Sequence, residues 1–128
     1  MSVPELNEEV RACCQALDDK KAEDITVLHL GPESSLADYF VIATGTSDPH
    51  LRALVNNVEA TLRERHVECV SSEKASKSGW MVVDAYDIIV HVFTAETRRY
   101  FNLEGLWRDA RRIQVSFPPP ARASATAP

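Results

Sequence analysis

The spacing of apolar residues changes several times along the chain, and each change predicts a new element. Near the N-terminus, Ser2 and Glu5 form a capping-box pattern that predicts the start of a helix. Ile25 to Leu30 and Tyr39 to Thr44 are mostly aliphatic runs that predict strands, the second buried on both faces. The first helix is expected to pack on a core through a stripe at helical spacing, made of Leu6, Val10, Cys13 or Cys14, and Leu17.

The turn from Gly45 to Pro49 predicts the start of a second helix. Thr46, Ser47 and Asp48 offer side-chain oxygens for the N-cap, and Pro49 suits the first turn. A short third strand is predicted at Val67 to Val70, and a polar loop at Ser71 to Ser78. The buried face of the second helix is predicted from five apolar residues at helical spacing, Leu51, Leu54, Val55, Val58 and Leu62.

The segment from Trp80 to Phe93 predicts a β-hairpin with one aliphatic face and one mixed face. With Ala85 and Tyr86 as a two-residue turn, the register places Val83 opposite Ile88 and Met81 opposite Val90. The mixed face then carries three pairs: Asp84 opposite Asp87, Val82 opposite Ile89, and Trp80 opposite His91. A sheet with one buried face normally presents bland polar residues on the other. The tryptophan, the histidine, the two aspartates and Phe93 instead predict an outward recognition surface.

Thr94 predicts the N-cap of a last helix, which Asn102 and Gly105 should divide into two short pieces. Its expected apolar face is Tyr100, Leu103, Leu106, Trp107 and Ala110. The predicted order is α-β-β-α-β-β-β-α, a mixed five-stranded sheet with about three helices in one α/β domain over residues 1–115. Residues 116–128 are rich in proline and alanine and are predicted to be a disordered tail.

The composition is that of a soluble globular protein, with 128 residues, 45% hydrophobic and 26% charged. The net charge of -5 argues against nucleic acid as the main ligand and favours a neutral or basic protein partner. The N-terminus lacks the pattern of a secretory signal, and no apolar run approaches the ~20 residues of a membrane helix. The three cysteines form no CxxC pair, which favours reduced thiols. We therefore expect a cytoplasmic protein.

Few residues indicate catalysis. Asp84 and Asp87 resemble the paired carboxylates that hold metal ions in nucleotidyl transfer, but no further carboxylate is evident in the sequence. The Gly45-Thr46-Ser47 turn lacks both glycine-rich phosphate motifs, and capping explains it better. His91 and the pair Arg98-Arg99 have structural explanations as well. A nucleotidyltransferase-like, metal-dependent enzyme stays open as the alternative, beside a passive module whose outer sheet face pairs with itself.

Three blocks of the chain resemble the ribosomal silencing factor family, the RsfS or Iojap group. They are Asp38 to Ser47, Trp80 to Phe93, and Arg98 to Trp107, in the family's order and spacing. The resemblance implies a nucleotidyltransferase-like fold and a non-enzymatic factor with no cofactor or metal. Such a factor binds protein fourteen of the large ribosomal subunit and sterically blocks joining of the small subunit when nutrients are scarce. The resemblance also suggests homodimers and leaves open a minor contact with ribosomal RNA.

The resemblance places the family's partner-facing residues at Trp80, Asp84, Asp87, His91, Arg98, Tyr100, Leu103 and Trp107. The sequence departs from the family at Glu73-Lys74, where Glu-Gly is frequent, and at Ala85-Tyr86, where a glycine is frequent. Ala-Tyr is poor for a type I′ turn, which needs positive φ at both positions. The predicted mechanism is occupancy, through the mixed face of the hairpin and the helix that follows it.

Overall fold

The computed structural model describes residues 8–30, 37–69, 71–73, 79–107 and 110–115. In chain order, the elements are α1 (Glu8–Asp19), β1 (Glu23–His29), β2 (Tyr39–Gly45), α2 (Asp48–Glu64), β3 (Ser71–Glu73), β4 (Trp80–Ala85), β5 (Ile88–Thr94), α3 (Ala95–Phe101), α4 (Leu103–Leu106) and β6 (Arg111–Gln114). The predicted mixed α/β fold is confirmed, as is the division of the last helix at Asn102. The predicted capping pair at Ser2 and Glu5 and the predicted tail lie outside the described residues.

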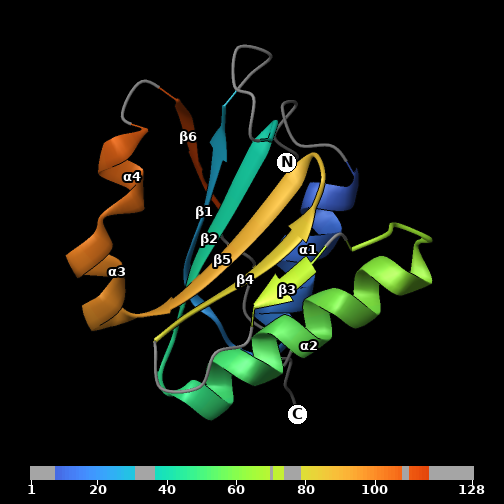
Figure 1. The fold of residues 1–128 in the computed structure, drawn as a ribbon, viewed down its shortest axis with the longest axis horizontal. Coiled ribbons are helices and arrows are strands. Elements are labelled where there is room, and N and C mark those ends of the chain that lie inside the picture. Colours follow the sequence, from blue (N-terminus) through green and yellow to red (C-terminus); the bar gives the residue numbers. More distant parts are fainter. Residues whose placement is uncertain (1–7, 31–36, 70, 74–78, 108–109, 116–128) are drawn as a thin grey trace, which may run out of the picture.

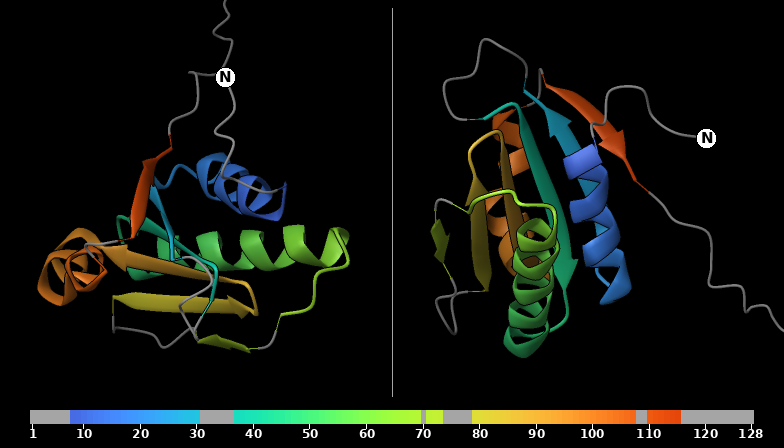
Figure 2. Two further views of the ribbon diagram at one scale, coloured as in Figure 1. Left: turned by 90° about the horizontal axis from the view of Figure 1, so that it is seen from above. Right: turned by 90° about the vertical axis from the view of Figure 1, so that its right-hand side faces the viewer.

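The strands form one sheet in the order β3-β4-β5-β2-β1-β6. β2 pairs in parallel with β5, and the other neighbouring strands pair antiparallel. Figures 1 and 2 show α1 and α2 on one face of the sheet and α3 and α4 on the other. Helices on both faces explain why every residue of β2 is buried, as predicted.

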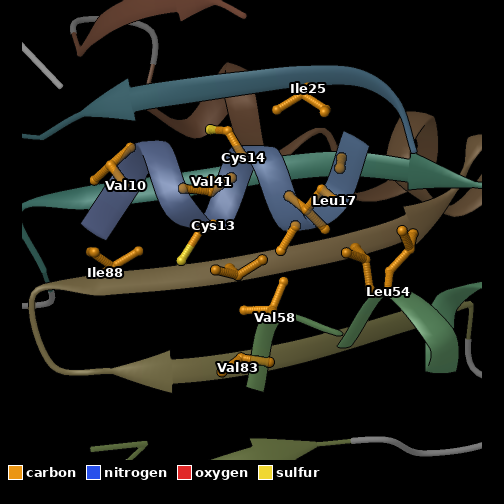
Figure 3. Packing of buried hydrophobic residues seen from close by; sticks show 14 of the residues in the cluster. Val10, Cys13, Cys14, Leu17, Ile25, Val41, Leu54, Val58, Val83 and Ile88 are labelled. Atoms are coloured by element: carbon orange, nitrogen blue, oxygen red, sulfur yellow. The ribbon is translucent and has the colours of Figure 1, made fainter. Parts of the chain in front are cut away.

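The larger core lies between the sheet and the helices α1 and α2. Figure 3 shows Val10, Cys13 and Leu17 of α1 facing the sheet, together with Leu54 and Val58 of α2. All five apolar positions predicted for α2 are buried, because the helix presents them at regular spacing to the same surface. The opposite face of the sheet carries a smaller cluster of Leu28, Ala37, Phe40, Ile42 and Phe93. We call this face the mixed face, as in the sequence prediction.

The turn before α2 serves to cap the helix, as predicted. The Ser47 side chain accepts a hydrogen bond from the His50 backbone N–H at 3.2 Å, and the Thr46 backbone N–H donates to His50 Nδ1 at 2.9 Å. Gly45 permits a close approach, since a Cβ there would lie 2.6 Å from the Leu51 side chain. Helix capping therefore accounts for this turn.

The third strand is not where the sequence predicted it. The Val67 backbone N–H closes the end of α2 by donating to the Leu62 carbonyl at 2.8 Å, after His66 takes a left-handed φ of 61°. The apolar run at Val67 thus ends a helix, and β3 follows at Ser71–Glu73, within the predicted polar loop. A sixth strand, Arg111–Gln114, pairs with β1 and was not predicted.

The hairpin exists, but its predicted register is wrong by two residues. Ala85 pairs with Ile88, so the turn is Tyr86-Asp87 instead of Ala85-Tyr86. The Tyr86 backbone N–H donates to Asp84 Oδ1 at 3.1 Å while Tyr86 adopts a φ of 67°. Ala85 is buried and extends the strand. A shift by two keeps every side chain on its predicted face but changes its partner across the strands.

With this register, Trp80 pairs with Phe93 instead of His91, and His91 pairs with Val82. The turn itself is tied to the start of β2, because the Asp87 carbonyl accepts hydrogen bonds from the backbone N–H groups of Asp38 and Tyr39 at 2.9 and 3.0 Å. The outer end of the hairpin is therefore fixed to the centre of the sheet.

The left-handed conformation of Tyr86 leads to a stability prediction. A non-glycine residue in this region is strained, and the Tyr86 side chain is 63% exposed, so it contributes little packing. Replacing Tyr86 by glycine should raise the free energy of unfolding by about 0.5–1 kcal/mol, after the entropy of the more flexible unfolded chain is subtracted. Urea denaturation of Tyr86→Gly and the parent chain measures this difference. A lower midpoint for the variant would contradict it.

Candidate partner-binding surface

The eight residues predicted to face a partner do not form a single patch. Asp84 and Asp87 lie at the hairpin turn, whereas Trp80 begins β4 at its other end. Asp84 lies four residues after Trp80 along the strand, which corresponds to about 13 Å. Figure 1 shows the hairpin turn and α3 at opposite ends of β4 and β5. The other predicted residues belong to the end where α3 and α4 lie.

The mixed face is largely covered at that end. His91 is 7% exposed and Phe93 is 0% exposed, so the prediction that they face outward is wrong. The physical reason is that the chain folds back after Thr94 and lays two short helices over the sheet. Leu103 and Trp107 pack against the smaller cluster, and the Trp107 ring meets Phe40 edge-to-face at 5.7 Å.

Trp80 lies at the edge of the covered region and is half-buried. Its ring stacks on Phe93 with centroids 5.1 Å apart and meets Phe101 at 4.8 Å. Its indole N–H donates to His91 Nδ1 at 3.2 Å. Val82, Asp84 and Ile89 continue the mixed face toward the hairpin turn and are also half-buried. The indole therefore lies at the boundary between the part of the mixed face that is covered near α3 and α4 and the half-buried part near the hairpin turn.

Three large apolar side chains of α3 and α4 are exposed. Tyr100 is 82% exposed, Leu106 is 74% exposed and Phe101 is 43% exposed. A shallow groove is lined by Phe101, Asn102, Gly105 and Leu106. We call Trp80, Tyr100, Phe101 and Leu106 the aromatic patch. The helical spacing of apolar residues predicted that Tyr100 and Leu106 pack inward, whereas the family resemblance placed Tyr100 among the partner-facing residues. Phe101 was not among the predicted contact residues, although its place beside Tyr100 was the available signal.

Arg98 holds this part of the chain on the sheet. Its guanidinium donates to both carboxylate oxygens of Glu104, at 2.8 and 3.2 Å. It also donates to Thr44 Oγ1 at 2.8 Å and Thr26 Oγ1 at 3.3 Å, and to the Asp24 carbonyl at 2.8 Å. These bonds join α3 to α4, β1 and β2, so the structure gives Arg98 intramolecular partners. The hydrogen bond from Arg98 lowers the pKa of Glu104 despite its burial.

His91 is a neutral histidine inside an aromatic environment. Because the Trp80 N–H donates to Nδ1, the ring proton must be on Nε2. Nε2 is buried without a hydrogen-bond partner among the described residues. Removal from water lowers the pKa of His91 from 6.5 to about 4. The imidazole therefore acts as an acceptor toward Trp80 at neutral pH.

The hairpin turn is acidic. Asp87 and Asp38 are exposed there, and Asp84 is half-buried. Within the described ranges, no three His, Cys, Asp or Glu side chains gather as a metal site. In the same part of the chain, no helix combines the length and apolar character needed to cross a membrane.

A family model described as ribosomal silencing factor during starvation matches residues 3–128. The chain belongs to this family. The ribosomal silencing factor RsfS of Bacillus subtilis is 36% identical over 108 residues, which cover 84% of this chain and 92% of the relative. The RsfS of Chromobacterium violaceum is 37% identical over 103 residues, covering 80% of this chain and 84% of the relative. An Iojap-related mitochondrial protein of Arabidopsis thaliana is 38% identical over 95 residues, covering 71% and 52%.

Solved structures agree with this membership of the RsfS family. A crystal structure of a Chromobacterium violaceum protein superimposes with a TM-score of 0.76 at 31% identity, over 97% of this chain and all (100%) of that one. A Bacillus halodurans crystal structure gives a TM-score of 0.73 at 31% identity, covering 85% of this chain and 100% of that one. The relatives carry the name of a silencing factor and not that of an enzyme.

The Arg98 network predicts an asymmetry between neighbouring arginines. Arg98→Ala should lower the free energy of unfolding by about 2–3 kcal/mol, because it removes the hydrogen-bonded cation from the half-buried Glu104 carboxylate. Arg99 is exposed, so Arg99→Ala is the matched control and should stay within about 0.5 kcal/mol of the parent. Chemical denaturation measures both changes. Equal small effects would show that the network contributes little to stability.

His91 predicts how stability depends on pH. Its pKa is about 4 in the folded chain and 6.5 unperturbed, so between these values the unfolded chain binds a proton that the folded chain does not. Above pH 6.5 the neutral His91 does not reduce the free energy of unfolding. As the pH falls from 6.5 toward 4, the free energy of unfolding decreases by about 3 kcal/mol in total because of this group. Denaturation is measured at several pH values between 4 and 6.5. The free energy of unfolding should change less steeply with pH for His91→Asn than for the parent. Identical slopes would contradict the assignment.

Proposed function

We propose that this chain is a ribosomal silencing factor that binds protein fourteen of the large ribosomal subunit. By occupying the surface that meets the small subunit, it prevents the two subunits from joining and lowers translation under nutrient limitation. The mechanism is steric, with no bond made or broken. Family membership supports this proposal, and a mouse relative at 35% identity is named for assembly of the ribosomal large subunit. Such a partner would place the chain in the cytoplasm, with the ribosomes.

The observation that carries the proposal is the aromatic patch. Exposed Tyr100 and Leu106 lie on two short helices, and Phe101 of the first helix contacts both Tyr100 and the half-buried Trp80. Exposed apolar residues that lie together mark interaction sites, and tryptophan and tyrosine are prominent among interface hot spots. Arg98 fixes the helices to the sheet, so the patch is already arranged before a partner arrives. A rigid surface loses less entropy on binding.

The eight predicted contact residues then take different roles. Trp80 and Tyr100 contact the partner directly, while Leu103 and Trp107 support the patch from below. Arg98 and His91 do not contact the partner; Arg98 holds α3 and α4 on the sheet, and His91 accepts a hydrogen bond from Trp80. Asp84 and Asp87 lie at the far end of the hairpin and favour encounter with a basic ribosomal protein through long-range attraction. Self-association through the aromatic patch would compete with ribosome binding, so a homodimer would be the inactive form.

Two exposed tyrosines test where binding occurs. Tyr100→Ala should weaken binding to large subunits by about 2 kcal/mol, because the ring is a proposed hot spot. Tyr86→Ala removes the same side chain from the hairpin turn, where it is 63% exposed, and should change affinity less than twofold (~0.4 kcal/mol). Both rings are largely exposed, so neither variant should unfold. Co-sedimentation with purified large subunits gives the affinities.

The same samples test the mechanism. Small subunits are added to large subunits that carry the protein, and joined particles are separated on a sucrose gradient. The parent chain and Tyr86→Ala should reduce the joined fraction, and Tyr100→Ala should not at the same concentration. If the parent binds large subunits yet small subunits join normally, the steric mechanism is wrong. If the two tyrosine variants lose the same affinity for large subunits, the contact is not confined to the aromatic patch.

A further inference from the structure

His91 contacts Trp80 diagonally across the hairpin. The two are not paired across the strands, since Trp80 opposes Phe93 and His91 opposes Val82. The indole nevertheless reaches diagonally to donate to His91 Nδ1 at 3.2 Å, on the same face of the sheet. The ring planes of Trp80 and His91 are tilted by 36° with centroids 5.9 Å apart, so the contact is a hydrogen bond at the ring edges and not a stack.

Three contacts restrain how the indole lies. Phe93 on one strand and Phe101 on α3 meet the ring, at 5.1 and 4.8 Å, and restrain its plane. Ring contacts alone do not distinguish the indole from its flipped rotamer, in which the N–H edge points the other way. The hydrogen bond to His91 selects one of these orientations. A tryptophan held in one rotamer loses little entropy when a partner covers it.

Fold stability alone does not explain a histidine at this position. Its Nε2–H is buried and has no partner in the described part of the chain, and an unsatisfied buried donor destabilises the folded state. Its neighbours are apolar rings, with Phe40 at 4.7 Å and Phe93 at 6.2 Å. An apolar residue such as leucine would avoid the unsatisfied donor, but it would offer no acceptor to Trp80.

We propose that His91 is a positioning residue: its Nδ1 fixes the Trp80 indole in the orientation that a partner binds, and the fold gives up stability for it. The inference rests on the proposed function, because Trp80 is taken there to contact the large subunit. It assigns to His91 a role that needs no contact with the partner. The role requires a hydrogen-bond acceptor at the Nδ1 position and not an imidazole as such.

The experiment compares variants that separate the acceptor from the ring. In His91→Leu the acceptor is lost, whereas in His91→Asn a carbonyl oxygen takes the place of Nδ1. We expect His91→Leu to be at least as stable as the parent while binding large subunits about tenfold more weakly. His91→Asn should bind within about threefold of the parent. Combined with Trp80→Phe, which has no N–H to position, His91→Leu should cause no further loss of affinity.

A spectroscopic measurement on the free protein accompanies the binding data. The indole N–H resonance of Trp80 should shift or broaden in His91→Leu and stay near its parent position in His91→Asn, while the Trp107 resonance serves as the internal reference. If His91→Leu does not fold, His91→Gln replaces it, because glutamine offers its oxygen near the Nε2 position and not near Nδ1. His91→Gln should then weaken binding and shift the Trp80 resonance, unlike His91→Asn.

The outcomes distinguish the two proposals. Parallel losses of stability and affinity in the leucine and asparagine variants would reduce His91 to a structural residue. An unchanged Trp80 resonance and unchanged affinity in His91→Leu would overturn the positioning role. If the parent chain itself does not bind large subunits, the proposed function is wrong. In that case the Trp80 resonance still decides whether His91 fixes the ring.

Discussion

The contact between the guanidinium of Arg98 and the sheet is the interaction on which the rest of the mixed face depends. Helix α3 has seven residues and α4 has four, lengths at which an isolated helix is not stable in water. All their residues lie in the described part of the chain, and none of their side chains is fully buried. Packing alone therefore holds these helices weakly. Arg98 adds hydrogen bonds to two strands and to the next helix. These bonds stabilise the two short helices and also determine where they lie on the sheet.

The same arrangement explains why apolar residues remain on the surface. Asn102 adopts a left-handed φ of 46° and caps both α3 and α4, so the chain changes direction there. The apolar stripe of one long helix is thereby divided. Leu103 and Trp107 turn toward the sheet and cover the smaller cluster, while Tyr100 and Leu106 remain outside. The cover of the core and the aromatic patch are two sides of one short segment.

The sequence predicted the elements whose pattern repeats several times. The second helix shows its apolar period over 17 residues and carries a serine cap, so its buried face was predicted completely. The edge strands Ser71–Glu73 and Arg111–Gln114 were missed, because a short edge strand needs few buried residues and shows no alternation. The hairpin register failed for a local reason. Nothing in Ala85-Tyr86-Asp87 indicates that Tyr86 takes the left-handed conformation.

Side-chain exposure on the mixed face was the least predictable property. Alternation correctly assigned His91 and Phe93 to one face of the strand, but whether that face is open depends on residues more distant in the chain. Leu103 and Trp107 cover it only because the helix breaks at Asn102. The family resemblance likewise marked Arg98 without indicating whether it meets a partner or the protein itself. Five hydrogen bonds within the chain supply that information.

The two faces of the sheet differ in what they contribute. The face under α1 and α2 is packed with aliphatic side chains, which supply stability without directional bonds. In the described part of the chain, the buried polar side chains are Thr26, Thr44 and His91. Each makes a hydrogen bond on the mixed face, the side of the sheet away from α1 and α2. The threonines accept from Arg98 and so place the helices, while the histidine accepts from Trp80. Because a hydrogen bond fixes direction and an apolar contact does not, polar groups inside this face determine where its outer groups lie.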